Sequence, residues 1–135
     1  MIEKKNWQTS PAAPAPALRK VASVSPFPLP ESYLEFLSNS NGGEGALGVS
    51  PDWLILFPAE EVAEIEENAT FHEFFKGYFV IGGSGGGDAI ALTANTEGQV
   101  NVVAFDMTNI DLKESVVLLA PTFDALIEML EDREA

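Results

Sequence analysis

Hydrophobic residues recur every three or four positions in three segments of the chain, the spacing that places side chains on one face of an α-helix. In the first segment Pro30 suits the first helical turn, and the apolar positions are Leu29, Tyr33, Phe36 and Leu37. Asn41, Gly42 and Gly43 follow, and we expect them to end the helix in a left-handed turn. The pattern therefore predicts a short amphipathic helix that begins near residue 30.

Two more helices are predicted further along the chain. Pro58 starts one of them, with acidic residues in the first turn, where the helix dipole favours them, and with Val62 and Ile65 as a thin apolar stripe. We expect this helix to lie on the surface. The other helix closes the domain, with Thr122 as its N-cap. Its predicted buried face consists of Phe123, Leu126, Ile127 and Leu130.

Short apolar runs between the helices predict β-strands. The run GALGVSPDWLILF (45–57) is interpreted as two extended pieces around Ser50, Pro51 and Asp52. The further candidates are YFVIGG (78–83), DAIALTA (88–94), VNVVAFD (100–106) and SVVLLA (115–120). The connections within 78–106 are too short for a parallel crossover, so we expect an antiparallel meander. Helices before and after a run of strands indicate an α+β fold with a central, largely antiparallel sheet flanked by short helices.

The first 25 residues differ from the rest in composition. They are rich in Pro, Ala and Ser, and the sequence PAAPAPA has no hydrophobic period and favours an extended, polyproline-like backbone. We therefore predict a tail or linker over residues 1–25 and one domain over residues 26–135. Trp7 is the residue that could pin the tail to the domain.

Acidic residues dominate the chain and limit its partners. The 135 residues include 21 Asp and Glu against 7 Lys and Arg, a formal net charge of −14. From residue 21 onward there are 20 acids and 3 bases. Such a surface repels nucleic acid and anionic membranes and attracts a cationic partner. The same charge also serves solubility alone, so the composition leaves both interpretations open.

The chain has no cysteine and a single histidine, His72. This composition excludes disulfides, thiolate nucleophiles and Cys-based metal sites, and His72 cannot build a zinc site from His ligands by itself. We expect neither a metal nor a cofactor. Prolines interrupt the start of the chain, unlike a secretion signal, and the longest apolar runs are too short to span a bilayer. We therefore expect a soluble, cytoplasmic protein.

The stretch GGSGGGDAI (82–90) holds five of the eleven glycines and resembles, at first sight, a phosphate-binding loop. A P-loop needs a lysine and a hydroxyl residue after its last glycine and then a helix, whereas here Asp88 and a predicted strand follow. Asp88 would also repel a phosphate. The glycines are better explained by a hairpin connection in which they permit positive φ.

Other candidate catalytic groups lack the context that their chemistry needs. Ser84 is flanked by glycines but is not followed by the strand-to-helix elbow of a serine hydrolase. Asp88 and Asp106 are two acids among 21, and nothing in the sequence sets the separation that a carboxylate pair requires. His72 lies among phenylalanines and is better explained as a partly buried surface residue. We therefore expect no enzymatic activity.

The predicted helix after Pro58 carries four glutamates on adjacent turns, namely Glu60, Glu61, Glu64 and Glu67. At spacings of three and four they neighbour one another, which is unfavourable by about a few tenths of a kcal/mol per pair. They form either an ordinary solvated face or a negative ridge for a basic partner. If the chain binds such a partner, we expect these four residues to contact it, with Asp88 as an outside candidate.

The order of these features resembles the SMI1/KNR4 family, also called the SUKH superfamily. The resemblance covers about residues 28–131, in the stretches LPESYLEFLSNSNGGEG, WLILFPAEEV, FVIGGSGGGDAIAL and APTFDALIEML. Five residues match the family's motif, and their expected role is architectural, in helix termination and a tight turn. They are Asn41, Gly42, Gly43, Gly87 and Asp88. The glycine expansion before Asp88 departs from the family's pattern, and the Pro/Ala-rich start stands where the family usually has a preceding helix.

The resemblance implies a non-enzymatic role. Bacterial members of the family are mostly immunity proteins, which bind and neutralise toxin domains delivered between competing cells, many of them nucleases. Nuclease domains are commonly basic where they hold phosphate, so an acidic protein suits such a partner. The resemblance therefore predicts an immunity protein that neutralises a basic, nuclease-type toxin domain. The alternative that stays open is a regulatory or scaffold module with a cellular housekeeping partner, as in the fungal relatives.

Overall fold

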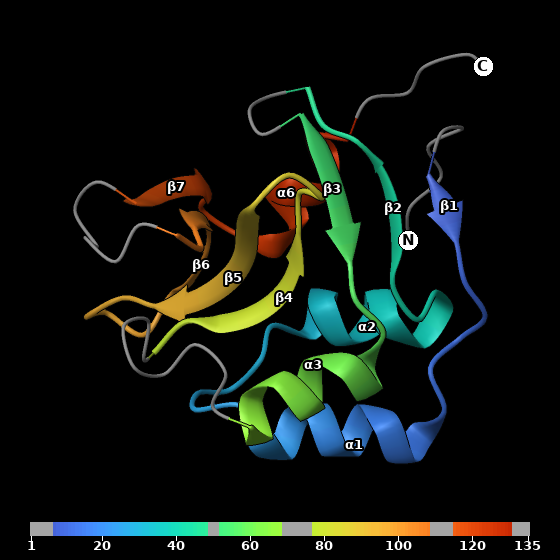
Figure 1. Ribbon diagram of the computed structural model, residues 1–135. Helices are drawn as coiled ribbons and strands as arrows, with labels where there is room; N and C mark the ends of the chain where they lie inside the picture. The colour runs from blue at the N-terminus through green and yellow to red at the C-terminus, as the bar shows by residue number, and fades with distance from the viewer. Residues whose placement is uncertain (1–6, 49–51, 69–76, 109–114, 131–135) are drawn as a thin grey trace.

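In the computed structural model, which describes residues 7–48, 52–68, 77–108 and 115–130, the chain forms one seven-stranded sheet and four α-helices (Figure 1). The strands are β1 (Gln8–Thr9), β2 (Gly43–Ala46), β3 (Trp53–Leu56), β4 (Phe79–Gly83), β5 (Asp88–Ala94), β6 (Val100–Asp106) and β7 (Val116–Ala120). The helices are α1 (Ala15–Val24), α2 (Glu31–Asn39), α3 (Ala59–Glu67) and α6 (Phe123–Glu128).

The sheet is a continuous meander. Its strands are hydrogen-bonded in the order β1-β2-β3-β4-β5-β6-β7, so that every strand pairs with its neighbours in the sequence. All of these pairings are antiparallel. Between β4, β5 and β6 the connections are short, and this favours antiparallel pairing because they cannot carry the chain back to the starting end of a parallel neighbour. The prediction of an α+β fold with a largely antiparallel sheet is confirmed.

All three predicted helices occur at the expected positions, and α3 begins directly after Pro58. Helix α2 follows Pro30, whose φ of −59° is already close to helical, and it buries Tyr33, Phe36 and Leu37. Helix α6 follows Thr122, whose Oγ1 accepts a hydrogen bond from the Ala125 N–H at 3.0 Å. The prediction of Thr122 as an N-cap is therefore confirmed.

The core has two parts, one on each face of the sheet. Successive side chains of a strand point to opposite faces, so Ile90 and Leu92 of β5 join the larger cluster while Ala89 and Ala91 join the smaller one. The larger cluster includes buried residues of α1, α2, α3 and α6. Strand β5 is therefore buried on both faces, at the centre of the fold.

The N-terminal segment is not the tail that its composition predicts. Residues 15–24 form helix α1, in which Ala17 and Val21 are buried in the larger cluster, and α1 packs along α3 (Figure 1). The prediction is wrong because alanine is the strongest helix former and proline is tolerated in a first turn. The last proline of the segment, Pro16, lies in that first turn and leaves the helix interior intact.

Trp7 fastens the same segment to the edge of the sheet. Its side chain is only 6% exposed, and its ring meets that of Phe36 edge to face, with centroids 6.0 Å apart. The indole lies directly over the backbone of Gly43, where a Cβ atom would come within 2.7 Å of its Nε1. Trp7, which the sequence offered as a residue that could pin this segment to the domain, does so in the structure.

The Asn-Gly-Gly sequence does not end α2 in the way predicted. The residue after the helix is Ser40, which is extended at φ −150° and donates its N–H to the Phe36 carbonyl at 2.8 Å. Positive φ values come later, at Gly42 (94°) and Gly43 (141°), where the chain turns into β2. A Cβ on Gly42 would lie 2.6 Å from the Leu56 carbonyl oxygen. Glycine is therefore required by the turn and by a close backbone approach, not by the helix end.

We expect Trp7→Ala to lower the free energy of unfolding by about 3–5 kcal/mol, the usual range for removing a large buried aromatic side chain. Chemical denaturation followed by far-UV circular dichroism measures this loss. Thr9→Ala is the control, because Thr9 lies two residues away with an exposed side chain. If Trp7→Ala changes stability no more than Thr9→Ala does, the N-terminal segment is the tail that its composition indicated.

Candidate acidic groove

Helix α3 presents its acids to solvent because its apolar side chains face inward. Ala59, Val62 and Ala63 are buried, and Ile65 is half-buried. The prediction that this helix lies on the surface is confirmed, and Val62 of its apolar stripe belongs to the larger core cluster. Beside the helix lies an open groove of about 740 Å³. Its lining consists of Asn41, Pro58, Glu60, Glu61, Glu64, Ile65 and Asn68, and we call it the acidic groove.

The side chain of Asn41 ties the turn before β2 to the start of α3. Pro58 occupies the N-cap position and offers no side-chain acceptor, so the first amides of the helix need a partner from elsewhere. The Oδ1 of Asn41 accepts a hydrogen bond from the Ala59 N–H at 2.7 Å. Its Nδ2 donates to the Glu60 Oε1 at 2.8 Å. One amide thereby caps α3 and orients a carboxylate of the groove.

The same contact keeps Glu60 charged. The hydrogen bond from Asn41, and after it the backbone N–H of Glu60 itself, lowers the pKa of the Glu60 carboxyl below its ordinary value. Because the folded-state pKa is lowered, the interaction stabilises the fold above the ordinary carboxyl pKa, and its contribution is lost as the pH falls through the lowered value. At neutral pH the carboxylate is ionised, which is the state that attracts a cation.

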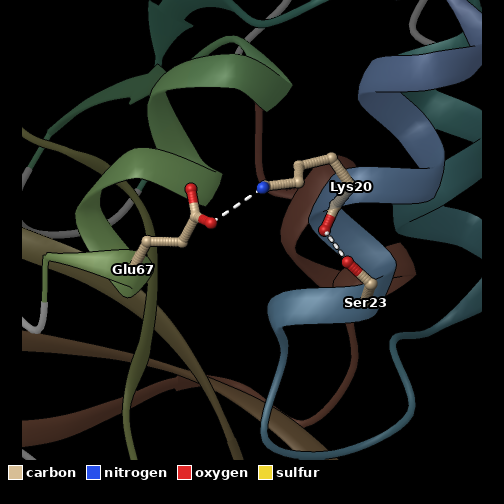
Figure 2. A network of polar contacts seen from close by, with 3 residues as sticks. All are labelled: Lys20, Ser23 and Glu67. Carbon is tan, nitrogen blue, oxygen red and sulfur yellow. Dashed lines mark hydrogen bonds and ion pairs between the residues drawn. The ribbon is translucent and has the colours of Figure 1, made fainter.

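Glu67 is directed toward α1 and does not line the groove. Its Oε2 lies 2.7 Å from Lys20 Nζ, and the carbonyl of Lys20 accepts a hydrogen bond from Ser23 Oγ at 2.8 Å (Figure 2). Helix α3 has no basic residue in its last turn, so Lys20 supplies the positive charge that a helix C-terminus favours. Both ion-pairing side chains are about half exposed, which limits the pair to about 1 kcal/mol or less.

The structure therefore divides the four glutamates predicted to contact a partner. Glu60, Glu61 and Glu64 line the groove together. Glu67 does not line it and is paired with Lys20. In the part of the chain that the structure describes, the basic side chains are Arg19 and Lys20, both on α1, and neither lines the groove. Among the described residues, then, no basic side chain lines the groove beside Glu60, Glu61 and Glu64.

Residues 84–87 of the glycine-rich stretch connect β4 to β5, as predicted, while Gly82 and Gly83 belong to β4. The Ser84 N–H donates to the Asp88 carbonyl at 3.0 Å and closes the loop. The Ser84 hydroxyl accepts hydrogen bonds from the N–H groups of Gly86 at 3.1 Å and Asp88 at 3.3 Å. Gly87 has a φ of 111°, which fits its predicted place in a tight turn. The backbone N–H groups that a phosphate would need as donors are therefore already bound to the Ser84 hydroxyl.

Asp88 lies outside the acidic groove, at the start of β5. There it is the register partner of Asp106 on β6, a juxtaposition that the sequence could not specify. The Oδ1 of Asp106 accepts hydrogen bonds from the hydroxyl and the N–H of Thr108, and these lower the pKa of the Asp106 carboxyl. A general acid in a hydrolytic pair needs the opposite shift. The backbone of Asp88 closes the loop through its two hydrogen bonds with Ser84, which fits the architectural role predicted for this residue.

Within the described ranges, no three side chains of His, Cys, Asp or Glu are grouped to hold a metal ion. None of the helices there combines the length and apolar character needed to cross a bilayer. His72, weighed above as a general base, lies outside the described residues.

Fold and site together define an α+β domain with a seven-stranded antiparallel meander and an acidic groove along one surface helix. The sequence model of the SMI1 / KNR4 family (SUKH-1) matches residues 15–129, and the chain belongs to this family. The match begins at the first residue of α1, in agreement with the packing of that helix into the core. A comparison with curated protein sequences gives no match.

We expect Asn41→Ala to raise the pKa of Glu60 and to lower the free energy of unfolding by about 1 kcal/mol, because it removes both a helix cap and a carboxylate partner. NMR titration of the Glu60 side chain measures the first effect, and urea denaturation the second. Asn39→Ala is the control, since the Asn39 amide bonds to the Glu35 carbonyl on α2. An unchanged Glu60 pKa in Asn41→Ala would show that this contact does not set the charge of the groove.

Proposed function

We propose that this chain is a non-enzymatic immunity protein that neutralises a basic toxin domain by binding it at the acidic groove. Its family includes immunity proteins, which supports this general role. The observation that carries the proposal is the groove itself, in which Glu60, Glu61 and Glu64 converge with two amide side chains. A basic, nuclease-type toxin is the partner that this charge favours.

The composition of the groove suits lysine and arginine side chains. Three exposed carboxylates accept hydrogen bonds from ammonium or guanidinium groups, and charged pairs of this kind are stronger than neutral ones. The amides of Asn41 and Asn68 add donors and acceptors at the rim, while the half-buried Ile65 offers an apolar surface for the aliphatic stems of such side chains. A basic loop or helix therefore has complementary chemistry along the whole groove.

The net charge supports fast capture of such a partner. A formal charge of −14 attracts a cationic protein from a distance, and complementary potentials raise association rates more than they raise affinity. Neutralisation then follows from occupancy, because a nuclease whose phosphate-binding surface is covered cannot hold its substrate. The mechanism requires no bond to be made or broken by this chain.

We expect the triple variant Glu60→Gln, Glu61→Gln, Glu64→Gln to bind the basic partner at least about tenfold more weakly, with most of the loss in the association rate. The partner is first captured from the native host with the tagged wild-type chain and eluted at low and then high salt. It is then purified, and binding is measured by surface plasmon resonance across a range of salt concentrations. Co-expression with the partner tests whether toxicity is relieved.

A matched control removes three exposed carboxylates elsewhere, at Glu31, Glu35 and Glu97. This control carries the same net charge as the groove variant, so it separates the local site from the overall field. If both variants lose binding to the same extent, the effect comes from net charge alone and the groove is not the binding site. Capture of a housekeeping protein in place of a toxin would move the assignment to the regulatory scaffold role.

A further inference from the structure

Strand β7 ends the sheet but has the character of an interior strand. Its residues 116–120 have the sequence VVLLA, without a charge or a proline, and among the described residues it pairs only with β6. Val117 is 60% exposed and Leu118 is 62% exposed. Neighbouring residues of a strand point to opposite faces, so apolar surface is exposed on both faces of the edge. A strand that is apolar on both faces is typical of the inside of a sheet.

The opposite edge of the sheet is protected. Strand β1 is two residues long, Gln8 and Thr9 are polar and exposed, and Pro11 follows shortly after. Short strands, polar side chains and prolines are the usual means by which a sheet edge avoids pairing with another chain. Strand β7 has none of these features over Val116–Leu118, where it is in regular register with β6. It is therefore the edge of the sheet that can pair with a further strand.

We propose that the strand which completes this edge is β7 of a second copy of the chain, paired antiparallel about a two-fold axis. Such an interface is self-complementary, because each copy offers the same apolar strand that the other requires. Antiparallel pairing also continues the pattern of the whole sheet. The contact closes both exposed edges at once and leaves the protected β1 edges at the two ends of a continuous sheet.

The net charge of the chain favours contact between two copies at an uncharged segment such as β7. Two copies with a formal charge of −14 each repel one another, and the described segment 115–120 contains no ionisable side chain. Self-association through β7 is therefore independent of the acidic groove and of the function proposed for it.

The dimer is weak and strengthens with salt. One pair of short strands buries less than the roughly 1,200 Å² typical of stable complexes, so we expect a weak, reversible dimer. Raising the ionic strength from about 0.05 to 0.5 M shortens the range of the repulsion from about 14 to 4 Å. The dimer should tighten severalfold over this interval, whereas binding of a cation at the groove should weaken.

Sedimentation velocity of the full chain, from micromolar to millimolar concentration at both salt levels, tests the proposal. We expect a reversible monomer–dimer equilibrium that tightens with salt. Leu118→Lys should raise the dissociation constant at least tenfold at either salt level. Leu118→Thr, which keeps a residue with high strand propensity, should weaken the dimer without the risk that an added charge disturbs the fold.

Thr9→Lys is the matched control, since it adds the same charge to an exposed position on the protected edge. The dimer of this variant should still tighten as salt is added, and it should be weakened much less than the dimer of Leu118→Lys. Circular dichroism confirms that each variant is folded. A chain that stays monomeric at millimolar concentration in high salt overturns the proposal, as does a dimer that both Leu118 variants leave unchanged.

Discussion

The acidic face of this domain depends on the side-chain amide of Asn41. Helix α3 begins with a proline that cannot cap it, and its first residues include two glutamates. Asn41 accepts from the first amide of the helix and donates to the Glu60 carboxylate, so it fixes both the start of α3 and the charge that the helix presents. The next residue, Gly42, lies so close to the Leu56 carbonyl that a Cβ atom would not fit there. The hydrogen bonds of Asn41 therefore also hold the turn before β2 against the end of β3.

Helix α1 gives the acidic helix its second support. It packs along α3, and its Lys20 forms an ion pair with Glu67. Glu67 lies at the C-terminus of α3, where the helix dipole disfavours a carboxylate. The acids at the start and middle of α3 therefore line the groove, whereas Glu67 at its end is paired with Lys20 within the fold. In this way a helix with five glutamates remains stable while three of them stay available to a partner.

Local patterns were sufficient to predict most elements, and they failed where distant residues decide the structure. Helical spacing located α2 and α3, and the short connections around 84–87 and 95–99 fixed the antiparallel order of β4, β5 and β6. The α1 helix was missed because its prolines suggested an extended tail, although they stop at its first turn. The link from Asn41 to Ala59 spans 18 residues, and the Lys20–Glu67 pair joins two helices, so neither leaves a periodic signal. The Asn-Gly-Gly motif was predicted to end α2, whereas its asparagine caps the start of α3.

The central claim is that the acidic groove is the surface that meets a basic partner. Hydrogen–deuterium exchange of the chain, alone and saturated with its purified partner, tests this claim most directly because it maps the covered backbone. The account predicts new protection at residues 58–68 and at the 41–43 turn, and little change at β7. Protection confined to other surfaces, with the exchange of α3 unchanged, would contradict it.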